Sequence, residues 1–314
     1  MIKSKYLIIP PFSISILDSN KELTPFNKDL TFLDLCRYIN LKVLPSNFLK
    51  NYDNVKYLFL PNSIYLISPN ALSNKKLIYV NFVSLKNIVS IGKCAFFNNY
   101  IKYLNLSYSK KLKFIDDEAF SFNNIYRMHL PDNISLIANE CFRNNKLKKI
   151  DLSNIKSPLT FFSSVFVYNQ IEDIIFSSSI VELGSSSFEN NNLVNLDLSK
   201  LTNIISIPYR CFCNNHIETV ILPNNISKIE SFAFSHNDIK SLYMKNLLKL
   251  NKIGSNAFLS NNNLSYIEIN QNVNIFETFN VDRWGTFVRY YQMILNKGGT
   301  YVFSNGMWNF YKTF

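Results

Sequence analysis

The sequence predicts an α/β-type repeat solenoid: a right-handed array of short units with a parallel sheet on its inner face and short helical turns on its outer side. Three observations lead to this prediction. Phenylalanine recurs every 22 or 24 residues, an asparagine follows each such phenylalanine three positions later, and an alternating apolar segment accompanies each unit. Self-similarity at a period of about 20–50 residues is the signature of a stacked repeat architecture.

The recurrent phenylalanines are expected to form one aromatic layer inside the coil. They are Phe96, Phe120, Phe142, Phe166, Phe188, Phe212, Phe234 and Phe258. A large apolar residue stands five positions before every one of them, and alanine often stands directly before them, as Ala95 and Ala119 do. This spacing does not fit a strand with period two, so we predict a short helical turn packed closely on its neighbour.

Each unit also contains an alternating segment, for example Ile101-x-x-Leu104-x-Leu106. Apolar residues with period two are typical of a short strand with one buried face. Strands repeated in this way along a chain lie parallel, and their connections are normally right-handed. The sequence therefore predicts one strand, one turn and one return segment in each unit.

The asparagines that follow the phenylalanines have a predicted structural role. They are Asn99, Asn123, Asn145, Asn169, Asn191, Asn215, Asn237 and Asn261. A loop that enters a strand leaves backbone groups that sheet pairing does not satisfy, and buried groups of this kind must find partners. An amide side chain both donates and accepts hydrogen bonds, so a stacked row of asparagines is predicted to form a ladder between successive turns.

The repeat pattern divides the chain into three segments. Residues 41–270 hold about ten units of 22–24 residues, and residues 1–40 are interpreted as an N-terminal cap with a degenerate first unit. Residues 271–314 are interpreted as a C-terminal cap, because the open end of a solenoid must be covered. Within this cap we predict a short helix over residues 284–295 and a hairpin around Asn305-Gly306, a pair that favours a type I′ turn.

The unit N-x-L-x-x-L-x-L-P-x-x-I-x-x-I-x-x-x-A-F-x-x-N resembles the BspA-type, or Treponema-type, leucine-rich repeat over roughly residues 40–270. This resemblance implies a right-handed leucine-rich-repeat array. Members of the family are commonly described as bacterial or protist surface proteins that bind proteins of a host or of a neighbouring cell. The resemblance thus implies a protein partner and a cell-surface or secreted location.

The sequence itself leaves the compartment open. Met1–Leu17 contains two lysines followed by apolar residues, but Pro10-Pro11 interrupts the run and no A-x-A cleavage site follows. A cytoplasmic location is therefore the alternative to the cell surface. No run of about 18 apolar residues is present, so no membrane-spanning segment is predicted.

Signatures of catalysis are missing from the sequence, and we predict no enzyme activity, no catalytic residues and no cofactor. It contains no G-x-x-x-x-G-K-[ST], no G-x-G-x-x-G and no H-E-x-x-H motif. Cys211-x-Cys213-x-x-His216 could suggest zinc, but no fourth ligand is nearby, so no metal site is predicted. The net charge of +11 favours acidic partners, yet no nucleic-acid-binding module is present and a nucleic-acid partner is not predicted.

Outward-facing strand positions form a row that changes from aromatic to basic. We predict that this row binds a protein partner, because tyrosine and arginine are enriched at binding hot spots. Its residues are Tyr57, Phe59, Tyr79, Tyr103, Arg127, His129 and Lys149. The alternative is that these rings only stabilise the sheet by contacting one another. The leading hypothesis is a non-enzymatic, adhesin-like protein at a microbial surface, and the alternative is an intracellular scaffold that organises a complex.

Overall fold

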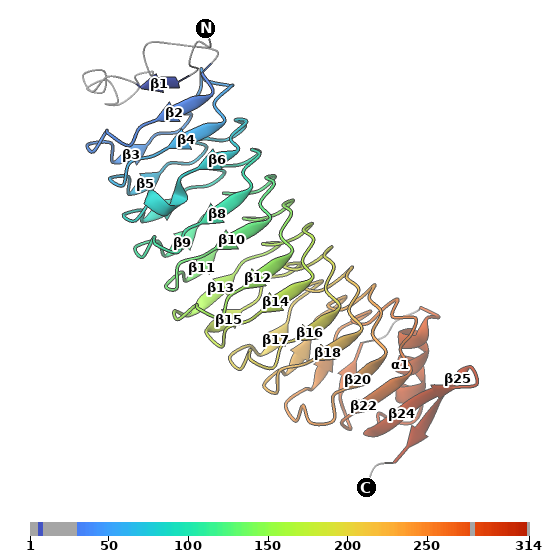
Figure 1. The fold of residues 1–314 in the computed structure, drawn as a ribbon. Coiled ribbons are helices and arrows are strands. Elements are labelled where there is room, and N and C mark those ends of the chain that lie inside the picture. The colour runs from blue at the N-terminus through green and yellow to red at the C-terminus, as the bar shows by residue number, and fades with distance from the viewer. Residues whose placement is uncertain (1–5, 9–29, 277–279, 313–314) are drawn as a thin grey trace. The chain divides into compact units, whose positions relative to one another are not determined.

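The computed structural model describes residues 6–8, 30–276 and 280–312, which belong to two compact units. Unit 1 comprises Met1–Leu147 and Ile155–Ser157, and unit 2 comprises Lys148–Asn154 and Pro158–Phe314. Within each unit, almost every repeat contributes a long strand of mostly three residues and a short strand of mostly two residues (Figure 1). Much of the predicted N-terminal cap, residues 1–5 and 9–29, lies outside the described residues.

Unit 1 contains two sets of parallel strands. Its first strand and its long strands are β1 (Tyr6–Ile8), β2 (Phe32–Asp34), β4 (Tyr57–Phe59), β6 (Tyr79–Val80), β8 (Tyr103–Asn105) and β10 (Arg127–His129). Its short strands are β3 (Val43–Leu44), β5 (Leu66–Ile67), β7 (Ser90–Ile91), β9 (Phe114–Ile115) and β11 (Leu136–Ile137). The order is β1-β2-β4-β6 in one sheet and β10-β8 in another, while the short strands pair in chain order.

Unit 2 repeats this arrangement and adds a helix and a hairpin. Its long strands are β12 (Lys149–Asp151), β14 (Asp173–Ile175), β16 (Asn195–Asp197), β18 (Thr219–Ile221), β20 (Ser241–Tyr243) and β22 (Tyr266–Ile269). Its short-strand set is β13 (Leu159–Phe161), β15 (Ile180–Glu182), β17 (Ser206–Ile207), β19 (Lys228–Ile229), β21 (Lys252–Ile253) and β23 (Asn274–Ile275). The long strands pair as β12–β14, β16–β18 and β20–β22, the short strands pair as β13–β15, β17–β19, β19–β21 and β21–β23, and all of these pairs are parallel. The predicted solenoid of parallel strands is confirmed, and the second set of strands was not foreseen.

The predicted helical turns on the outer side are not confirmed. In the described repeats the segment around each core phenylalanine forms hydrogen-bonded turns, and the only helical stretch in them is the 3₁₀ turn η2 (Phe82–Ser84). The reason is the backbone conformation on either side of the phenylalanine. Around Phe96, for example, Cys94 and Asn98 both have φ of 53°. Every repeat from Phe96 to Phe258 has left-handed residues two positions before and two positions after its core phenylalanine. A left-handed residue interrupts a right-handed helix.

The core phenylalanines form a regular ring stack within each unit. In unit 1, Phe96 and Phe120 lie with ring centroids 5.1 Å apart and an interplanar angle of 5°. In unit 2, Phe234 and Phe258 lie 5.4 Å apart at 4°. All eight rings are fully buried. Burying one such side chain stabilises the fold by about 1.5–3 kcal/mol, so the repeated ring layer is a major part of the core.

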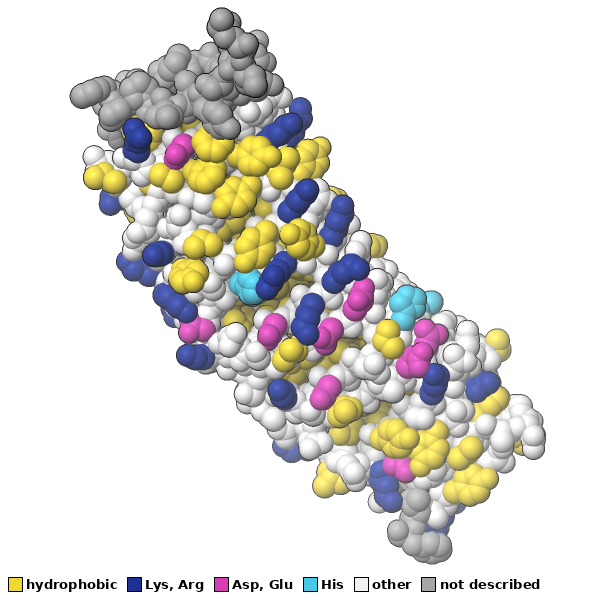
Figure 2. Space-filling view, in the orientation of Figure 1, with side chains coloured by type: hydrophobic (Ala, Val, Ile, Leu, Met, Phe, Trp, Pro, Cys, Tyr) yellow, Lys and Arg dark blue, Asp and Glu magenta, His cyan; other side chains and the backbone are white. Residues whose placement is uncertain are grey.

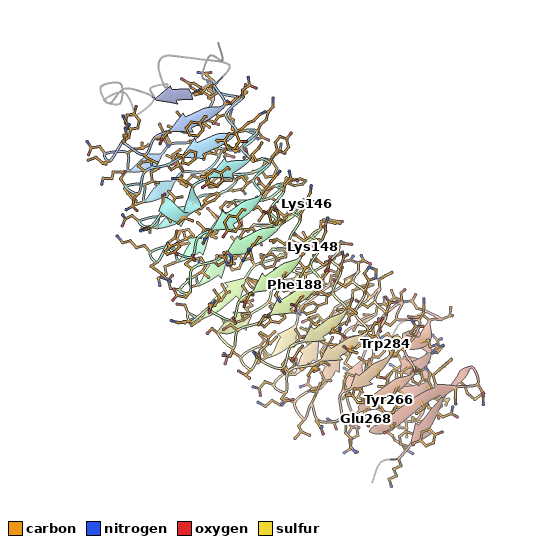
Figure 3. All side chains as sticks on the ribbon, in the orientation of Figure 1. Lys146, Lys148, Phe188, Tyr266, Glu268 and Trp284 are labelled. Atoms are coloured by element: carbon orange, nitrogen blue, oxygen red, sulfur yellow. The ribbon has the colours of Figure 1, made fainter. Side chains whose placement is uncertain are left out.

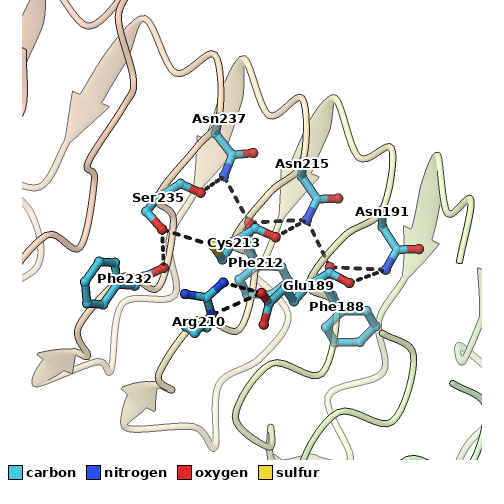
Figure 4. Close-up of polar contacts among 10 residues, drawn as sticks. All are labelled: Phe188, Glu189, Asn191, Arg210, Phe212, Cys213, Asn215, Phe232, Ser235 and Asn237. Carbon is cyan, nitrogen blue, oxygen red and sulfur yellow. Dashed lines mark hydrogen bonds and ion pairs between the residues drawn. The ribbon is translucent and has the colours of Figure 1, made fainter. Parts of the chain in front are cut away.

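The regular spacing of the asparagines along the chain places their side chains between successive turns (Figure 4). Asn215 Oδ1 accepts a hydrogen bond from the backbone N–H of Leu193 at 3.1 Å. Its Nδ2 donates to the carbonyl oxygens of Phe188 at 2.9 Å and Phe212 at 3.2 Å, which belong to two consecutive repeats. Asn237 repeats the pattern one turn later, and each of the eight asparagines is at most 8% exposed.

The C-terminal end of unit 2 departs from the repeat. The helix α1 (Arg283–Met293) covers most of the predicted helical stretch, residues 284–295, but begins one residue before it and ends two residues earlier. Asp282 caps α1 by accepting from the Gly285 N–H at 3.0 Å. Trp284 of α1 is fully buried and lies 4.8 Å from the Phe258 ring, where it continues the aromatic layer (Figure 3). At 11 residues, α1 is too short to cross a membrane, and the described part of the chain offers no other candidate span.

A hairpin completes this end. The strands β24 (Gly299–Ser304) and β25 (Met307–Tyr311) are antiparallel, and β24 pairs with β22 of the long-strand sheet. The connecting residues Asn305 and Gly306 both have positive φ, 52° and 78°, as a type I′ turn requires. The Asn-Gly pair in the sequence had predicted this two-residue turn.

Removing one rung of the asparagine ladder should destabilise the protein strongly. In Asn215→Ala the buried N–H of Leu193 loses its partner and two carbonyls lose a donor, so we expect a loss of about 2–4 kcal/mol in the free energy of unfolding. Urea unfolding followed by circular dichroism would measure it. The control is Asn192→Ala, an exposed residue directly before Leu193, which should change stability by less than about 0.5 kcal/mol. Equal effects of the two changes would contradict the ladder.

The buried thiols should make the protein lose stability at high pH. Burial raises the pKa of the Cys141 and Cys211 thiols, so the folded state keeps their protons when the unfolded state has lost them. Their contribution is fully present below the ordinary thiol pKa of about 8.5 and is lost as pH rises above it.

We therefore expect the urea concentration at the unfolding midpoint to decrease as the pH is raised from about 8.5 to about 10.5. This decrease should be smaller in the double variant Cys141→Ala/Cys211→Ala. Ala119 and Ala233 occupy the same position in their repeats as Cys141 and Cys211 do, so the fold accepts alanine there. Urea titrations across this pH range would measure the two slopes, and identical slopes would refute the assignment.

Candidate partner-binding surface

The three predicted tyrosines lie at the first position of consecutive long strands of unit 1. Tyr57 and Tyr79 are direct partners in the β4–β6 pair. Because the next residue of each strand is buried, the tyrosine side chains point away from the core. Tyr57 is 42% exposed and Tyr79 is 40% exposed, while Tyr103 on β8 is half-buried.

The aromatic rings on this face also contact one another. Phe59 lies between Phe32 and Tyr79, with ring centroids 5.0 Å and 5.5 Å apart. Cross-strand aromatic contacts of this kind stabilise a sheet, so part of the alternative interpretation holds for Phe59. Phe32 was not among the predicted residues. The signal was present, because Leu30-x-x-Leu33-x-Leu35 repeats the strand pattern, but it falls within the segment assigned to the cap.

The basic end of the row lies on β10. Arg127 is the direct partner of Tyr103, and His129 is the partner of Asn105. Arg127 and His129 are both exposed, and the His129 ring lies edge-on to Tyr103 with centroids 6.0 Å apart. We define the partner strip as the six of these residues that lie on unit 1. They are Tyr57, Phe59, Tyr79, Tyr103, Arg127 and His129.

Lys149, the seventh predicted residue, belongs to unit 2 and is engaged there. Its Nζ lies 2.7 Å from a carboxylate oxygen of Asp173 on the neighbouring strand β14. The hydrogen bond and the charge of Asp173 raise the pKa of Lys149. Lysine and carboxylate therefore compensate each other on the face of unit 2, and the structure does not group Lys149 with the partner strip.

The carboxylates on the long strands of unit 2 have local structural roles. Asp151 Oδ1 accepts from the backbone N–H and the hydroxyl of Ser153, at 3.0 Å and 2.6 Å. Asp197 Oδ1 accepts from the Ser199 N–H at 2.8 Å. These are Asx turns, which tie the end of a long strand to the following corner. Asn105 and Ser107 form the same turn in unit 1.

The cysteine and histidine pattern does not converge on one point. Cys211 and Cys213 are buried, and the Cys213 sulfur lies 3.1 Å from the Ser235 hydroxyl (Figure 4). His216 is exposed and lies 3.7 Å from Asp238 instead. Across residues 6–8, 30–276 and 280–312, no group of three His, Cys, Asp or Glu side chains is arranged to hold a metal ion.

The arrangement of these side chains suits contact with a large partner. The partner strip is part of an open sheet surface, with aromatic rings at one end and basic groups at the other. Lys56 and Lys102, which directly precede β4 and β8, are also exposed and add positive charge beside it. Figure 2 shows hydrophobic and basic side chains gathered on this face of unit 1.

Comparison with known proteins supports the same fold. A family model described as the BspA type leucine rich repeat region matches residues 42–164 and 159–281, with six copies of the repeat. No curated protein matches the chain. Among solved structures, the pneumococcal vaccine antigen PcpA is 20% identical, with 74% of this chain and 68% of that chain covered and a TM-score of 0.50.

A second solved structure also matches the chain. A leucine rich cell surface protein of Faecalibacterium prausnitzii is 16% identical, with 74% of this chain and 78% of that chain covered and a TM-score of 0.40. At such identities the likeness to the pneumococcal antigen concerns the fold alone. The family model covers well over half of the chain, and the chain belongs to the BspA-type leucine-rich repeat family.

Proposed function

We propose that this protein is a non-enzymatic solenoid that binds another protein through the partner strip on unit 1. One observation carries the proposal: aromatic side chains are exposed at equivalent positions of successive repeats where the fold does not require them. At the same position of the long strands, unit 2 has Asp173, Asn195 and Thr219. These polar residues support the same strands, so the tyrosines of unit 1 are not needed to form the sheet.

The chemistry of the strip supports a protein partner. Tyrosine offers a large contact area at low conformational cost together with a polar hydroxyl, and arginine offers several donors. The contacts among Phe32, Phe59 and Tyr79 hold the rings in place before a partner arrives, which lowers the entropy lost on binding. Lys149, held by Asp173, is not part of the proposed contact set.

The long strands of unit 2 give little support to catalysis. Asp151 and Asp197 accept hydrogen bonds from their own turns, and Lys149 is paired with Asp173. Side chains held in this way on an open sheet are poorly suited to proton transfer, which needs a group poised against a bound substrate. A binding function therefore fits the described residues better than an enzymatic one.

We also propose that the solenoid has dedicated ends. Trp284 packs against the last core phenylalanine, Phe258, and the β24–β25 hairpin pairs with the last long strand β22. These contacts support the division into an array over residues 41–270 and a C-terminal cap over residues 271–314. The cap would keep the apolar side of the final repeat away from water.

For the location we propose an adhesin-like role at a microbial cell surface. The support is family membership, since members are commonly described as surface proteins that bind proteins of a host or a neighbouring cell. An intracellular scaffold is the second candidate.

The triple variant Tyr57→Ala/Tyr79→Ala/Tyr103→Ala should lose its protein partner. Affinity purification from a host-cell lysate, followed by mass spectrometry, would identify proteins retained by the natural sequence, and interferometry would give their affinities. Loss of these three outward-facing rings should weaken binding at least about tenfold, because each hot-spot aromatic contributes about 2 kcal/mol.

The matched control for this variant is Tyr243→Ala, an outward-facing tyrosine on the long strand β20 of unit 2. It should leave the affinity unchanged, and both variants should keep the circular dichroism spectrum of the natural protein. Retention of the partner by the triple variant would rule out the partner strip as the binding site.

The surface role predicts that protease added to intact source cells will degrade the protein while a cytosolic marker survives. The exposed turns between strands would be cleaved only if they face the medium. Immunoblotting of treated and untreated cells would measure this. Full protection of the protein in intact cells, together with cleavage after lysis, would favour the intracellular scaffold.

A further inference from the structure

The two units differ in charge. Among the described residues, unit 1 has sixteen Lys and Arg against seven Asp and Glu, an excess of nine positive charges. Unit 2 has thirteen against eleven, an excess of two. Only two of the basic residues of unit 1, Lys56 and Lys102, stand directly before the strands that carry the partner strip, and Arg127 is part of it. Most of the excess therefore lies elsewhere on unit 1.

Much of this charge gathers at the corner between the long and short strands. We define the lysine corner as Lys86, Lys110, Lys111, Lys113 and Lys156, all in unit 1. The one carboxylate among them is Asp132, which lies 2.9 Å from Lys110 and 3.6 Å from Lys156. Figure 2 shows Lys and Arg side chains along the side of unit 1 where the short strands lie.

Beside the lysine corner lies an apolar face formed by the short strands of unit 1. Their outward positions are direct partners across five strands and form one continuous row. The row is Val43, Leu66, Ser90, Phe114 and Leu136. Tyr65 and Val89, which precede β5 and β7, widen it, and the exposed fractions of Tyr65, Val89 and Phe114 are 46%, 42% and 41%.

The fold does not require an apolar face at this position. In unit 2, the residues that occupy the same places on the short strands are Ser206, Lys228, Lys252 and Asn274. They form the same parallel pairs with the same spacing. The apolar side chains of unit 1 therefore serve something other than the solenoid itself.

The composition of the surface distinguishes between the partners that could cover it. Its cations are all lysines, which are depleted at protein interfaces and give diffuse attraction instead of the paired hydrogen bonds of arginine. Lysines near an anionic lipid surface each contribute about 1 kcal/mol, and exposed aromatic rings favour the depth of the lipid headgroups. Five strands about 4.8 Å apart make a face on the order of 20 Å wide, which suits an extended surface.

Acidic side chains lie on the other side of the short strands. Asp116, Asp117 and Glu118 follow β9 in the turn that carries the core phenylalanine, with Lys93 3.8 Å from Asp117. The lysine corner thus lies on one side of the apolar face, and these three carboxylates lie on the other, where Lys93 partly compensates them. A planar anionic surface would meet the lysines and the exposed rings while the acidic turn lies at its margin.

We propose that the short-strand face of unit 1, together with the lysine corner, docks on an anionic lipid surface. The lysines attract the headgroups, and Tyr65, Val89 and Phe114 enter the boundary between headgroups and acyl chains. This surface lies on the short strands, whereas the partner strip lies on the long strands, so lipid docking and protein binding use different side chains. The proposal goes beyond the protein-binding function and does not depend on it.

Co-sedimentation of the full chain with vesicles tests the proposal. The protein should bind phosphatidylcholine vesicles that contain phosphatidylserine, should not bind pure phosphatidylcholine vesicles, and should bind less as salt rises. Lys111→Glu/Lys113→Glu should lower the partition coefficient on anionic vesicles at least about tenfold. Val89→Ser/Phe114→Ser leaves the charge unchanged and should lower it by a similar factor.

The matched control is Lys249→Glu/Lys252→Glu in unit 2, which makes the same change in net charge. Lys249 occupies the same position in its repeat as Lys111 does, and each lysine donates to the Oδ1 of an asparagine in the preceding repeat. The control should keep vesicle binding within about twofold of the natural protein, and circular dichroism should show that all variants are folded.

Three results would overturn the proposal. The first is no binding to anionic vesicles, and the second is an equal loss of binding in the control, which would mean that only net charge matters. The third is binding to poly-glutamate through Lys111 and Lys113 with no binding to vesicles, which would make this face a site for an acidic protein. Unchanged vesicle binding by Val89→Ser/Phe114→Ser would remove the apolar contact from the proposal.

Discussion

The rest of the structure depends on how the backbone is satisfied where each turn enters a long strand. Strand pairing leaves the N–H at this corner without a partner, and the side chain of one asparagine supplies it, as Asn215 does for Leu193. The same amide group donates to carbonyl oxygens of two consecutive repeats and so links each turn to the one before. A buried N–H without a partner costs about 1–3 kcal/mol, and the ladder avoids this cost at every repeat.

This arrangement also determines the shape of the turn. Two left-handed residues flank each core phenylalanine, for instance Arg210 and Asn214 around Phe212, and they bend the chain so that the ring points into the stack. A helix in this segment would direct successive side chains to different sides of its axis. The phenylalanine rings of neighbouring repeats would then no longer lie one against the next. The short strand that precedes the turn adds a second set of parallel pairs, so that neighbouring coils such as those of β16 and β18 are paired through both their long and their short strands.

Because buried rings, asparagines and paired strands hold the coil together, outward-facing positions can differ between units without loss of the fold. Unit 1 uses this freedom on both of its faces: aromatic and basic residues occupy its long strands, and an apolar row beside lysines occupies its short strands. In unit 2 the equivalent positions are mostly polar, and several carboxylates there close local turns or pair with lysine. The proposed functions of unit 1 rest on this contrast between equivalent positions.

The sequence alone determined the features that depend on spacing: the repeat period, the parallel long strands, the buried phenylalanines, the row of asparagines and the turn at Asn305-Gly306. It indicated which long-strand residues point outward, because period two specifies this directly. It did not determine the return segment, since two-residue strands such as β9 are too short to show a period and the left-handed residues beside the phenylalanines belong to many residue types. Only the tertiary structure decided which outward side chains are already engaged, as Lys149 is with Asp173, and which neighbours form a continuous surface. Contacts between units depend on how the coils stack, and a local pattern contains no information about the side chain that lies across from it.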